Sequence, residues 1–422
     1  MNKNILLVSY TFPPFPGIGG RRWAKFAKEL SKRNFEVYVI AAKNPFKILS
    51  PWVNDVERSN IHITYLPLKY PSSLIQTPPD LWTKINYKVG LFYVKLFSKG
   101  NYYDRAVLWK KQVLREASKL IEKNQIKNVI VSGAPFHLIH HVLELKNNYP
   151  FLKVIADFRD PWTTNHAYMG FSELSEVRKN DERMMEKNVV NNADLVVSVS
   201  EEMTNYFRLL EGKNADKFIT IPNGFDSEDY KDSSLSVKKS DDKIRFLLTG
   251  TLYKNTETVF DAFINALLVL REKQPTIYHK LEFNFYGEAP AEYKIKVKNR
   301  NLEIIDFNHS VPLKEVYQKI SETNFCMLFL QDHLNYSFST KFYEYLAQKK
   351  KIVVFSKSGF TSEFVTKNKL GYWVSPENTY DDILEVVKKH ESGEADAVTD
   401  FDINNYSVSH LTDELVFHLN KL

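Results

Sequence analysis

The chain has 422 residues, of which 43% are hydrophobic, enough to bury sizeable cores in about two to three domains and to exclude wholesale disorder. The single cysteine, Cys326, lies in an apolar segment, which excludes a disulfide scaffold and suits a reducing compartment. The net charge of +6 favours anionic partners, and no apolar run reaches the roughly eighteen residues that a membrane-spanning helix needs.

The N-terminal residues predict the start of a parallel α/β sheet. Residues 5–9 and 37–41 are apolar runs typical of buried strands, and Arg21–Lys32 between them has the pattern of a helix. The first apolar run is short and a proline-rich loop, residues 10–16, follows it at once. We therefore do not expect a secretory signal.

The loop before this helix ends in Gly19 and Gly20, and Arg21 and Arg22 follow. A nicotinamide-binding fingerprint needs glycine directly after the strand, whereas three prolines come first here, so the pattern argues against a dinucleotide enzyme. Two glycines at the start of a basic helix suit the close approach of a diphosphate. A flexible glycine turn is the alternative interpretation.

Residues 81–111 form a basic and aromatic segment, with seven lysines and arginines, eight aromatic residues and a single acid, Asp104. On a helical wheel of residues 81–99 one narrow arc holds Lys84, Lys88, Lys95 and Lys99, and the row beside it holds Leu81, Ile85, Val89, Phe92 and Leu96. Such a helix is typical of an element that lies on an anionic membrane surface. The alternative is a surface helix that packs its apolar side on the domain and leaves its lysines solvated. No RNA- or DNA-binding motif accompanies the segment, so nucleic acid is not an expected partner.

Two further predicted strands, near 128–132 and 154–157, end in polar loops. His137 follows the first of them and has zinc-ligand spacing with His141, but Leu138 stands where a zinc protease needs its glutamate and no third ligand is evident, so we expect no metal site. His137 could face a substrate at the mouth of the sheet, or it could be a capping or core histidine.

Arg159 and Asp160 follow the second of these strands, at the edge where open α/β sheets bind ligands. A carboxylate there could position a hydroxyl group or accept its proton. The alternative is an ion pair that ties the loop down.

Composition divides the chain into two halves. We expect a first domain at 1–226, a polar, serine-rich linker at 227–242, a second domain at 243–400, and a C-terminal segment at 401–422 that ends in a helix. The second domain begins with a predicted strand at 244–249 and a loop that contains Gly250.

The most informative stretch is 336–346, which follows the apolar run 325–330 and begins a helix at Ser339 or Thr340. The free N–H groups of the first turn, together with Lys341, make an anion site that suits phosphate. Glu344 lies one turn further on, where its carboxylate could accept hydrogen bonds from the two vicinal hydroxyls of a ribose. The pair therefore predicts nucleotide binding; a capped amphipathic helix with one exposed glutamate is the alternative.

This stretch resembles the donor-site motif of retaining glycosyltransferases of the GT-B fold, the family 4 group. The family pattern is close to Pro-Ser-Lys-x-x-Glu-Tyr-Leu-Ala, and this chain has Ser-Thr-Lys-Phe-Tyr-Glu-Tyr-Leu-Ala from Ser339. In the family the glutamate that matches Glu344 holds the ribose of a nucleotide-sugar. Many members carry a second glutamate near the donor sugar, where this chain has Tyr336.

The resemblance extends along both halves of the chain. It implies that the loop with Gly19, Gly20 and Arg21 reaches toward the donor phosphates, and that Lys254, the basic residue in range after Gly250, helps to neutralise them. The segments around His137 and Arg159 resemble a subgroup linked to exopolysaccharide and capsule assembly. That likeness implies that Arg159 and Asp160 lie near the acceptor and the donor sugar.

We therefore expect an α/β chain with two Rossmann-like domains facing across a cleft, and a C-terminal helix that returns to the first domain. The resemblance implies a retaining, metal-independent hexosyltransferase that moves a sugar from a nucleotide-sugar to a hydroxyl of a glycan or lipid-linked acceptor in bacterial surface polysaccharide synthesis. No cofactor or metal is expected, and the location would be the cytoplasm or the inner face of the plasma membrane. Asp160 and His137 would orient the acceptor hydroxyl.

Two alternatives differ in class from this function. A sugar-nucleotide epimerase on the same fold would need several acids and histidines in the cleft, and only His137, Asp160 and their neighbours are available. A non-catalytic scaffold would tolerate Tyr336 and the few basic residues near the phosphates.

Overall fold

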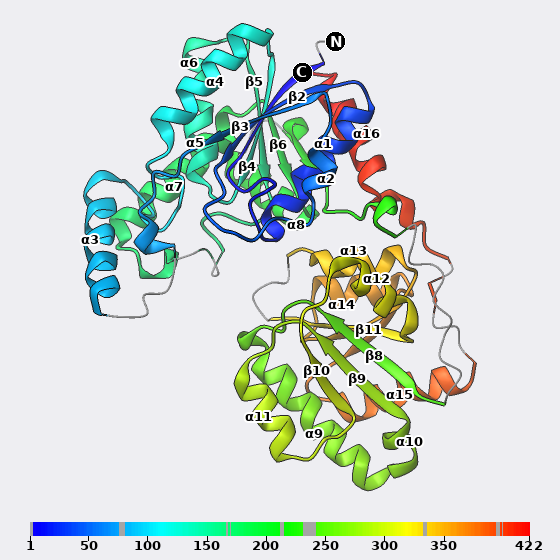
Figure 1. The fold of residues 1–422 in the computed structure, drawn as a ribbon. Helices are drawn as coiled ribbons and strands as arrows, with labels where there is room; N and C mark the ends of the chain where they lie inside the picture. Colours follow the sequence, from blue (N-terminus) through cyan, green and yellow to red (C-terminus); the bar gives the residue numbers. More distant parts are fainter. Residues whose placement is uncertain are drawn as a thin grey trace. The chain divides into compact units, whose positions relative to one another are not determined.

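The structure, a computed structural model, describes residues 3–75, 81–165, 168, 170–211, 215–230, 242–331, 336–393, 397–398 and 400–422. The chain forms two compact units (Figure 1). Unit 1 contains Met1–Pro222 and Val408–Leu422, and unit 2 contains Asn223–Ser407. Within the predicted linker, Ser227–Tyr230 is a short 3-10 helix, and residues 231–241 lie outside the described residues.

Unit 1 is built on a parallel sheet of seven strands in the order β3-β2-β1-β4-β5-β6-β7. The strands are β1 (Asn4–Ser9), β2 (Glu36–Ala42), β3 (Ile61–Leu66), β4 (Asn128–Gly133), β5 (Lys153–Phe158), β6 (Leu195–Ser198) and β7 (Phe218–Thr220). Its helices are α1 (Arg21–Lys32), α2 (Val53–Val56), α3 (Leu81–Phe97), α4 (Lys110–Asn124), α5 (His137–Leu143), α6 (Leu145–Asn148), α7 (Glu176–Asn192), α8 (Glu201–Glu211) and α16 (Val408–Leu419). Strands β1 and β4 pair in parallel at the centre of the sheet, with Leu7 opposite Ile130.

Both faces of this sheet are covered, which explains why β1 is apolar throughout. Ile5 and Leu7 belong to a core shared with α1 and α16, while Leu6 and Val8, which point the other way, are just as deeply buried. Strands buried on both faces lose the alternation of polar and apolar residues, so a continuous apolar run predicts them.

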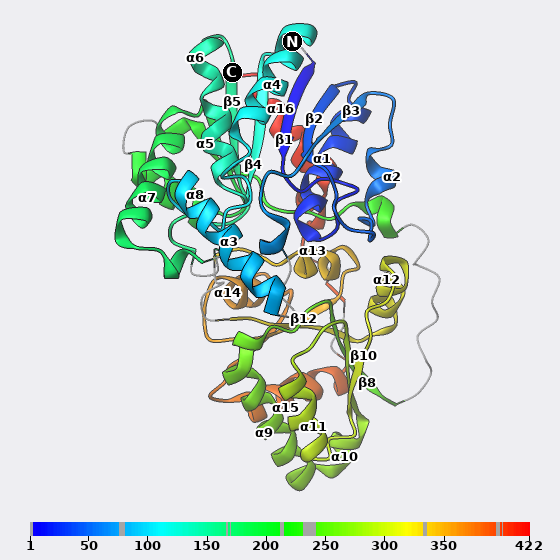
Figure 2. The ribbon, with the colours of Figure 1, turned by 60° about the vertical axis from the view of Figure 1, so that its left-hand side comes forward.

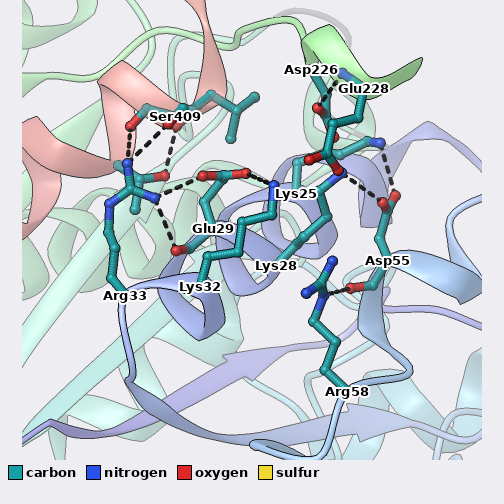
Figure 3. A network of polar contacts seen from close by, with 12 residues as sticks. Lys25, Lys28, Glu29, Lys32, Arg33, Asp55, Arg58, Asp226, Glu228 and Ser409 are labelled. Carbon is teal, nitrogen blue, oxygen red and sulfur yellow. Dashed lines mark hydrogen bonds and ion pairs between the residues drawn. The ribbon is translucent and has the colours of Figure 1, made fainter. Parts of the chain in front are cut away.

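The C-terminal helix α16 completes the core of unit 1. Its residues Val408, Leu411, Leu415 and Leu419 pack with those of α1. Polar contacts fix the same pairing: Arg33, just after α1, donates to the Ser409 carbonyl and forms an ion pair with Asp413, and Glu29 binds Arg33 from within α1 (Figure 3).

Unit 2 has a second parallel sheet of six strands in the order β10-β9-β8-β11-β12-β13. The strands are β8 (Ile244–Thr249), β9 (Leu281–Tyr286), β10 (Ile305–Asn308), β11 (Phe325–Phe329), β12 (Lys351–Phe355) and β13 (Gly371–Val374). The helices are α9 (Glu257–Lys273), α10 (Pro275–Lys280), α11 (Ala291–Asn299), α12 (Leu313–Glu322), α13 (Thr340–Ala347), α14 (Phe360–Lys367) and α15 (Thr379–Glu391).

Alternate residues of the central strands β8, β11 and β12 enter two separate cores. Met327 joins the core that α9, α10, α11 and α15 cover, whereas Cys326 and Leu328 join the core that α12, α13 and α14 cover. Figure 2 shows the sheet between these two layers of helices. The layer with α13 carries the motif at 336–346, so the motif is held by one of the best-packed parts of the unit.

Two further features of the described residues bear on function. None of the described helices is both long and apolar enough to cross a lipid bilayer. The side chain of Asp402, in an Asp-x-Asp sequence that resembles a metal motif, accepts a hydrogen bond from the Asn404 amide and caps a short 3-10 helix, Ile403–Tyr406. Its carboxylate therefore has a local structural role.

Candidate functional sites at the strand ends

In each unit the direction of the strand order reverses at one point, between β1 and β4 in unit 1 and between β8 and β11 in unit 2. Open α/β sheets bind ligands outside the carboxyl ends of the strands at such a point. In unit 2 the segments that leave this edge are the loop after β8, which contains Gly250, and the segment after β11, which leads to Ser339, Thr340 and α13.

Lys341, in the first turn of α13, lies across the end of β8. Its Nζ donates to the Thr251 carbonyl at 2.6 Å and is 5.9 Å from the centre of the Tyr253 ring. Burial lowers the pKa of Lys341 to about 8, although the nearby Glu344 carboxylate acts in the opposite direction. A buried ammonium at a helix N-terminus favours the binding of an anion, because both carry positive charge into a region of low dielectric.

The loop after β8 leaves no room for side chains beside Lys341. Gly250 has φ +79°, and a Cβ atom on it would lie 3.0 Å from Lys341 Cε. Gly287, at the end of β9, has φ +137°, and a Cβ there would lie 2.3 Å from the Gly250 carbonyl oxygen. The sequence predicted Gly250 as a site residue, but it missed Gly287, whose only signal was a glycine directly after a strand.

Helix α13 is docked by its aromatic face. Tyr345 is fully buried, and its hydroxyl accepts the Thr249 amide at 3.0 Å, while Phe342 and Leu346 are also fully buried. This contact fixes the start of α13 at the end of β8. It explains why the Tyr-Leu after the motif glutamate is apolar: these residues hold the helix in place.

The other predicted residues of α13 and its approach lie close to Lys341 in the chain. Glu344 is 8% exposed, and Tyr336, Ser339 and Thr340 are half-buried. Ser339 occupies the N-cap position without a side-chain capping bond, and within the described residues its buried hydroxyl has no partner. A buried hydroxyl at a helix start is a further donor for an anionic ligand.

Lys254 lies in a different environment. Its side chain is 80% exposed and its Nζ is 3.3 Å from a carboxylate oxygen of Glu292 in α11. The structure pairs this lysine with α11 rather than with α13. Exposed pairs of this kind are weak, so Lys254 would be free to change partner at little cost.

In unit 1, Arg159 connects three loops at the strand-order reversal. Its guanidinium donates to the carbonyls of Gly133 at 2.9 Å and Ala134 at 2.6 Å, and also to the carbonyl of Gly19. A Cβ on Gly19 would be 3.2 Å from this guanidinium, so the close approach requires glycine. Arg159 therefore positions the loops after β1 and β4, and its donors are already engaged.

A second buried arginine ties the start of α1 to β5. Arg22 bonds Asp157 at 3.0 Å and donates to the carbonyls of Ile221 and Pro222. Asp157, which is completely buried, also accepts from Trp23 and Ser132. These contacts use the guanidinium of Arg22 inside unit 1, so it is not offered to a diphosphate. Arg21, the predicted residue beside it, is 3% exposed, and Gly20 is likewise buried.

His137 does not face the mouth of the sheet. It is 1% exposed and its Nε2 is 2.6 Å from Glu182 of α7. Burial alone would lower the pKa of His137, but the carboxylates of Glu182 and Asp104 outweigh burial and raise the pKa to about 9. The structure thus favours the core-histidine alternative, with an ion pair whose carboxylate the sequence did not predict.

Two buried glutamates of α7 hold the loop that carries Asp160. Glu182 accepts the indole N–H of Trp162 at 2.6 Å, and Glu186 accepts the hydroxyls of Thr163 and Tyr206. Burial raises the pKa of Glu186. Asp160 itself is half-buried at the end of β5. In the sequence, Glu182 and Glu186 were marked only by their i, i+4 spacing on the side of α7 that also contains Val189.

The architecture can be compared with known proteins. No protein-family model and no curated protein sequence matches the chain. A glycosyltransferase from Rickettsia africae is similar over 99% of this chain and 98% of its own, with 12% identity and a TM-score of 0.66. The chain has the GT-B fold.

Other structures with this fold have sugar-nucleotide ligands. An E. coli trehalose-6-phosphate structure bound with UDP-2-fluoro glucose matches with a TM-score of 0.63 and 11% identity over 99% of both chains. A UDP-GlcNAc 2-epimerase from Neisseria meningitidis bound to UDP-GlcNAc matches with a TM-score of 0.53 and 14% identity, over 99% of this chain and 100% of its own. The GT-B fold therefore hosts transferases and epimerases, and the choice of function rests on the site.

Proposed function

We propose that this GT-B chain is a glycosyltransferase that moves a sugar from a nucleotide-sugar to a hydroxyl acceptor. The observation that carries the proposal is the half-buried Lys341 at the start of α13, whose ammonium is placed against a glycine loop at the strand-order reversal of unit 2. Among the described residues no carboxylate lies at hydrogen-bond distance from this ammonium, and such a cation suits a ligand that brings two or more negative charges, such as a diphosphate.

The donor would bind as follows. The diphosphate would accept hydrogen bonds from Lys341, from the first amides of α13 and from the Ser339 hydroxyl. Gly250 would let the phosphates approach the backbone, and Glu344 would accept both ribose hydroxyls. Tyr336 and Thr340 would line the same approach to α13. Lys254 would leave Glu292 to meet the outer phosphate.

The hydrogen-bond donors around the diphosphate would favour departure of the nucleoside diphosphate. Charge develops on the leaving phosphate as the bond to the sugar breaks, and donors already fixed around it stabilise that charge without reorganising. Lysine and helix amides would supply this stabilisation in place of a metal ion. The leaving phosphate would take the acceptor proton, since no residue of the site is placed as a covalent nucleophile among those described.

Unit 1 would supply the acceptor side. The Asp160 carboxylate would orient the acceptor hydroxyl, and Arg159 would keep the loops around it in place. His137 would act as a positioning residue, since it reaches the Asp160 loop through Glu182 and Trp162.

The finer features of the activity are also proposals, and they rest on the resemblance to family 4. The transferred group would be a hexosyl unit, its configuration would be retained, and the acceptor would be a glycan or a lipid-linked intermediate of bacterial surface polysaccharide. The protein would act in the cytoplasm, in part at the inner face of the plasma membrane.

A thermal-shift panel of nucleoside diphosphates and their sugar conjugates, with and without magnesium, tests the donor site. A ligand at about one hundred times its Kd stabilises the native state by about 2.7 kcal/mol, or roughly 5–10 °C for a unit of this size. We expect a metal-independent shift with one nucleotide, lost in Glu344→Ala. The matched control is Glu377→Ala, which removes an exposed carboxylate of unit 2 and should keep the shift.

The absence of a shift with every nucleotide would contradict the assignment of Lys341 and Glu344 and favour a scaffold. An epimerase is the second candidate, because similar structures include such enzymes. Incubation of the bound nucleotide-sugar without an acceptor separates the two. An epimerase converts the free nucleotide-sugar into its epimer, whereas a transferase leaves it unchanged until an acceptor hydroxyl is added.

A further inference from the structure

Helix α3 of unit 1 exposes an unusually large apolar surface. Its outward side chains are between 45% and 76% exposed, and they are Leu81, Trp82, Ile85, Val89, Phe92, Tyr93, Leu96 and Phe97. All eight lie on one helix of 17 residues at the edge of unit 1 (Figure 1). A contiguous apolar patch of this kind on a protein surface marks an interaction site.

The opposite side of α3 is fixed to unit 1. Val94 is fully buried with Tyr70 and Tyr102, and Gly90 packs on a 3-10 turn, Ser72–Leu74, where a Cβ would lie 2.8 Å from Ser73 Oγ. The helix therefore docks through its smallest residues. Its large apolar residues are left outside, which disagrees with the alternative interpretation that the apolar side of this helix packs on the domain.

The C-terminal end of α3 is clamped as well. Arg178 of α7 donates to the carbonyls of Lys95 at 2.7 Å and Gly100 at 2.8 Å, and its guanidinium lies 5.3 Å from the centre of the Tyr102 ring. Cations at a helix C-terminus stabilise it through the dipole. The exposed face thus belongs to an anchored helix, and its exposure does not come from a loose end.

The four lysines form one border of this face. Lys84, Lys88, Lys95 and Lys99 are all exposed. The first three lie within α3, where about 100° per residue puts them in an arc of about 40° beside the apolar row, and Lys99 follows the end of the helix. Within the described parts of the chain none of them is in an ion pair, and residues 81–103 contain no acid. The face is therefore apolar along its middle and purely cationic along one edge.

We propose that α3 is the docking surface of this protein for an anionic lipid bilayer, on which the helix lies parallel to the membrane plane. The apolar row would enter the boundary between head groups and acyl chains, the lysines would contact phosphate groups, and Trp82 and Tyr93 would lie at the interface. A second copy of the chain fits the face less well, because an antiparallel pair of α3 helices would bring the two lysine rows together, and in a parallel pair residues 81–103 offer no acid to pair with either row.

This surface is independent of the proposed transferase activity, so its test uses no nucleotide. The full chain is sedimented with vesicles of phosphatidylcholine, either pure or mixed with phosphatidylglycerol. Each lysine near an anionic surface contributes roughly a fivefold gain in affinity. We therefore expect at least tenfold tighter binding to the anionic vesicles, and weaker binding at high salt.

A charge variant and its matched control show whether anionic vesicles bind the lysines of α3 in particular or the positive charge of the whole chain. Replacing Lys84, Lys88, Lys95 and Lys99 by glutamine should weaken binding to anionic vesicles at least tenfold. The control makes the same change in net charge at four other exposed lysines, Lys123, Lys127, Lys187 and Lys298, and should leave binding within about twofold. Equal losses in the two variants would overturn the proposal.

The apolar row has its own test. Val89→Ser, Phe92→Ser and Leu96→Ser together should abolish vesicle binding while thermal unfolding stays unchanged, because these side chains make few contacts within unit 1. In the parent chain, vesicles should shift tryptophan emission to the blue, and Trp82→Phe should remove the shift. Equal binding to pure phosphatidylcholine would contradict the proposal. So would a dimer, measured by light scattering, that the serine changes dissociate without any vesicle binding.

Discussion

The ammonium of Lys341 is buried at a cost to unit 2. Its folded pKa of about 8 lies below the ordinary value of 10.5. Below pH 8 both folded and unfolded chains hold the proton, and the cost of burial is fully present. Between pH 8 and 10.5 the unfolded chain holds more protons, so stability rises with pH, by at most about 3 kcal/mol. A bound diphosphate would offset this cost by keeping the lysine charged.

The same pKa predicts how nucleotide affinity depends on pH. The anion binds the charged lysine, so Kd should be nearly constant from pH 7.0 to 7.5 and become about tenfold weaker by pH 9.0 as the free site loses its proton. Isothermal titration of the nucleotide identified by thermal shift measures this. In Lys341→Arg the charge persists throughout this range, and affinity should not fall. An equal fall in both proteins would show that another group titrates.

At the level of single residues, the sequence drew attention to candidate site residues more readily than to the residues that they contact. Lys341 and Glu344 stood out because their spacing on a helix has a chemical meaning. The Thr251 carbonyl, which receives the lysine, and Glu182, which receives His137, lie 90 and 45 residues away. Such pairings depend on strand register and helix docking, which no local pattern encodes. For the same reason the sequence did not show the three carbonyls that accept hydrogen bonds from Arg159, and its placement near the substrate remains a prediction.

At the level of the elements, the ends of β8 and β9 lie so close together that only glycine fits at positions 250 and 287. The Gly287 amide donates to the Asn308 carbonyl, and the Gly250 amide donates to the Tyr286 carbonyl at 2.7 Å. The loop that would receive the diphosphate is thus shaped by neighbouring strands, and its geometry depends on the absence of two Cβ atoms.

Gly287→Ala should therefore open this loop. The new methyl group would lie 2.3 Å from the Gly250 carbonyl oxygen, which cannot move without shifting β8. We expect a loss of roughly 2–4 kcal/mol in the free energy of unfolding of unit 2 from backbone strain and the clash, measured by urea denaturation, together with weaker nucleotide binding. Gly393→Ala is the matched control, since Gly393 also has positive φ but nothing within 4 Å. It should cost only about 1 kcal/mol.

The sequence predicted the boundaries of a helix correctly where the helical spacing of its apolar residues was clear. Residues 21–32 were predicted as a helix and form α1 over the same range. Helix α3 was also predicted, but not the side on which it packs. Gly90 and Val94 make that contact, and small residues leave no trace in a pattern of hydrophobicity. The packing side of α3 could not be predicted because the helix docks by close approach of its backbone at Gly90, whereas a hydrophobic pattern reveals only large apolar side chains.

For the molecule as a whole, each unit has its own core. The residues that pack with α16 all belong to unit 1, and the two cores of unit 2 contain no residue of it. Composition revealed the polar stretch near 227–242, because linkers are rich in serine and charge. That the last helix completes the first unit was implied only by the resemblance, since an amphipathic helix does not say which sheet it covers.

The separate cores predict two transitions in calorimetry. Leu415→Ala, which removes a side chain that is 1% exposed, should destabilise unit 1 by about 2–5 kcal/mol and lower its transition by roughly 5–15 °C. The transition of unit 2 should not move, whereas Gly287→Ala should move that one alone. Leu209→Ala, at an 84% exposed position of unit 1, is the control. If Leu415→Ala shifts both transitions equally, the units unfold as one.

The position of α16 in the chain also sets an order of events during synthesis. Unit 2 is one continuous segment, so it can finish folding once Ser407 has left the ribosome. Unit 1 is begun first, but its sheet lacks the cover of Val408–Leu422 until the whole of unit 2 has been synthesised. A nascent protein usually folds its N-terminal domain first, whereas here unit 1 can be completed only after unit 2 has been made. We therefore expect newly made unit 1 to wait with an open apolar groove beside α1, where chaperones can bind it.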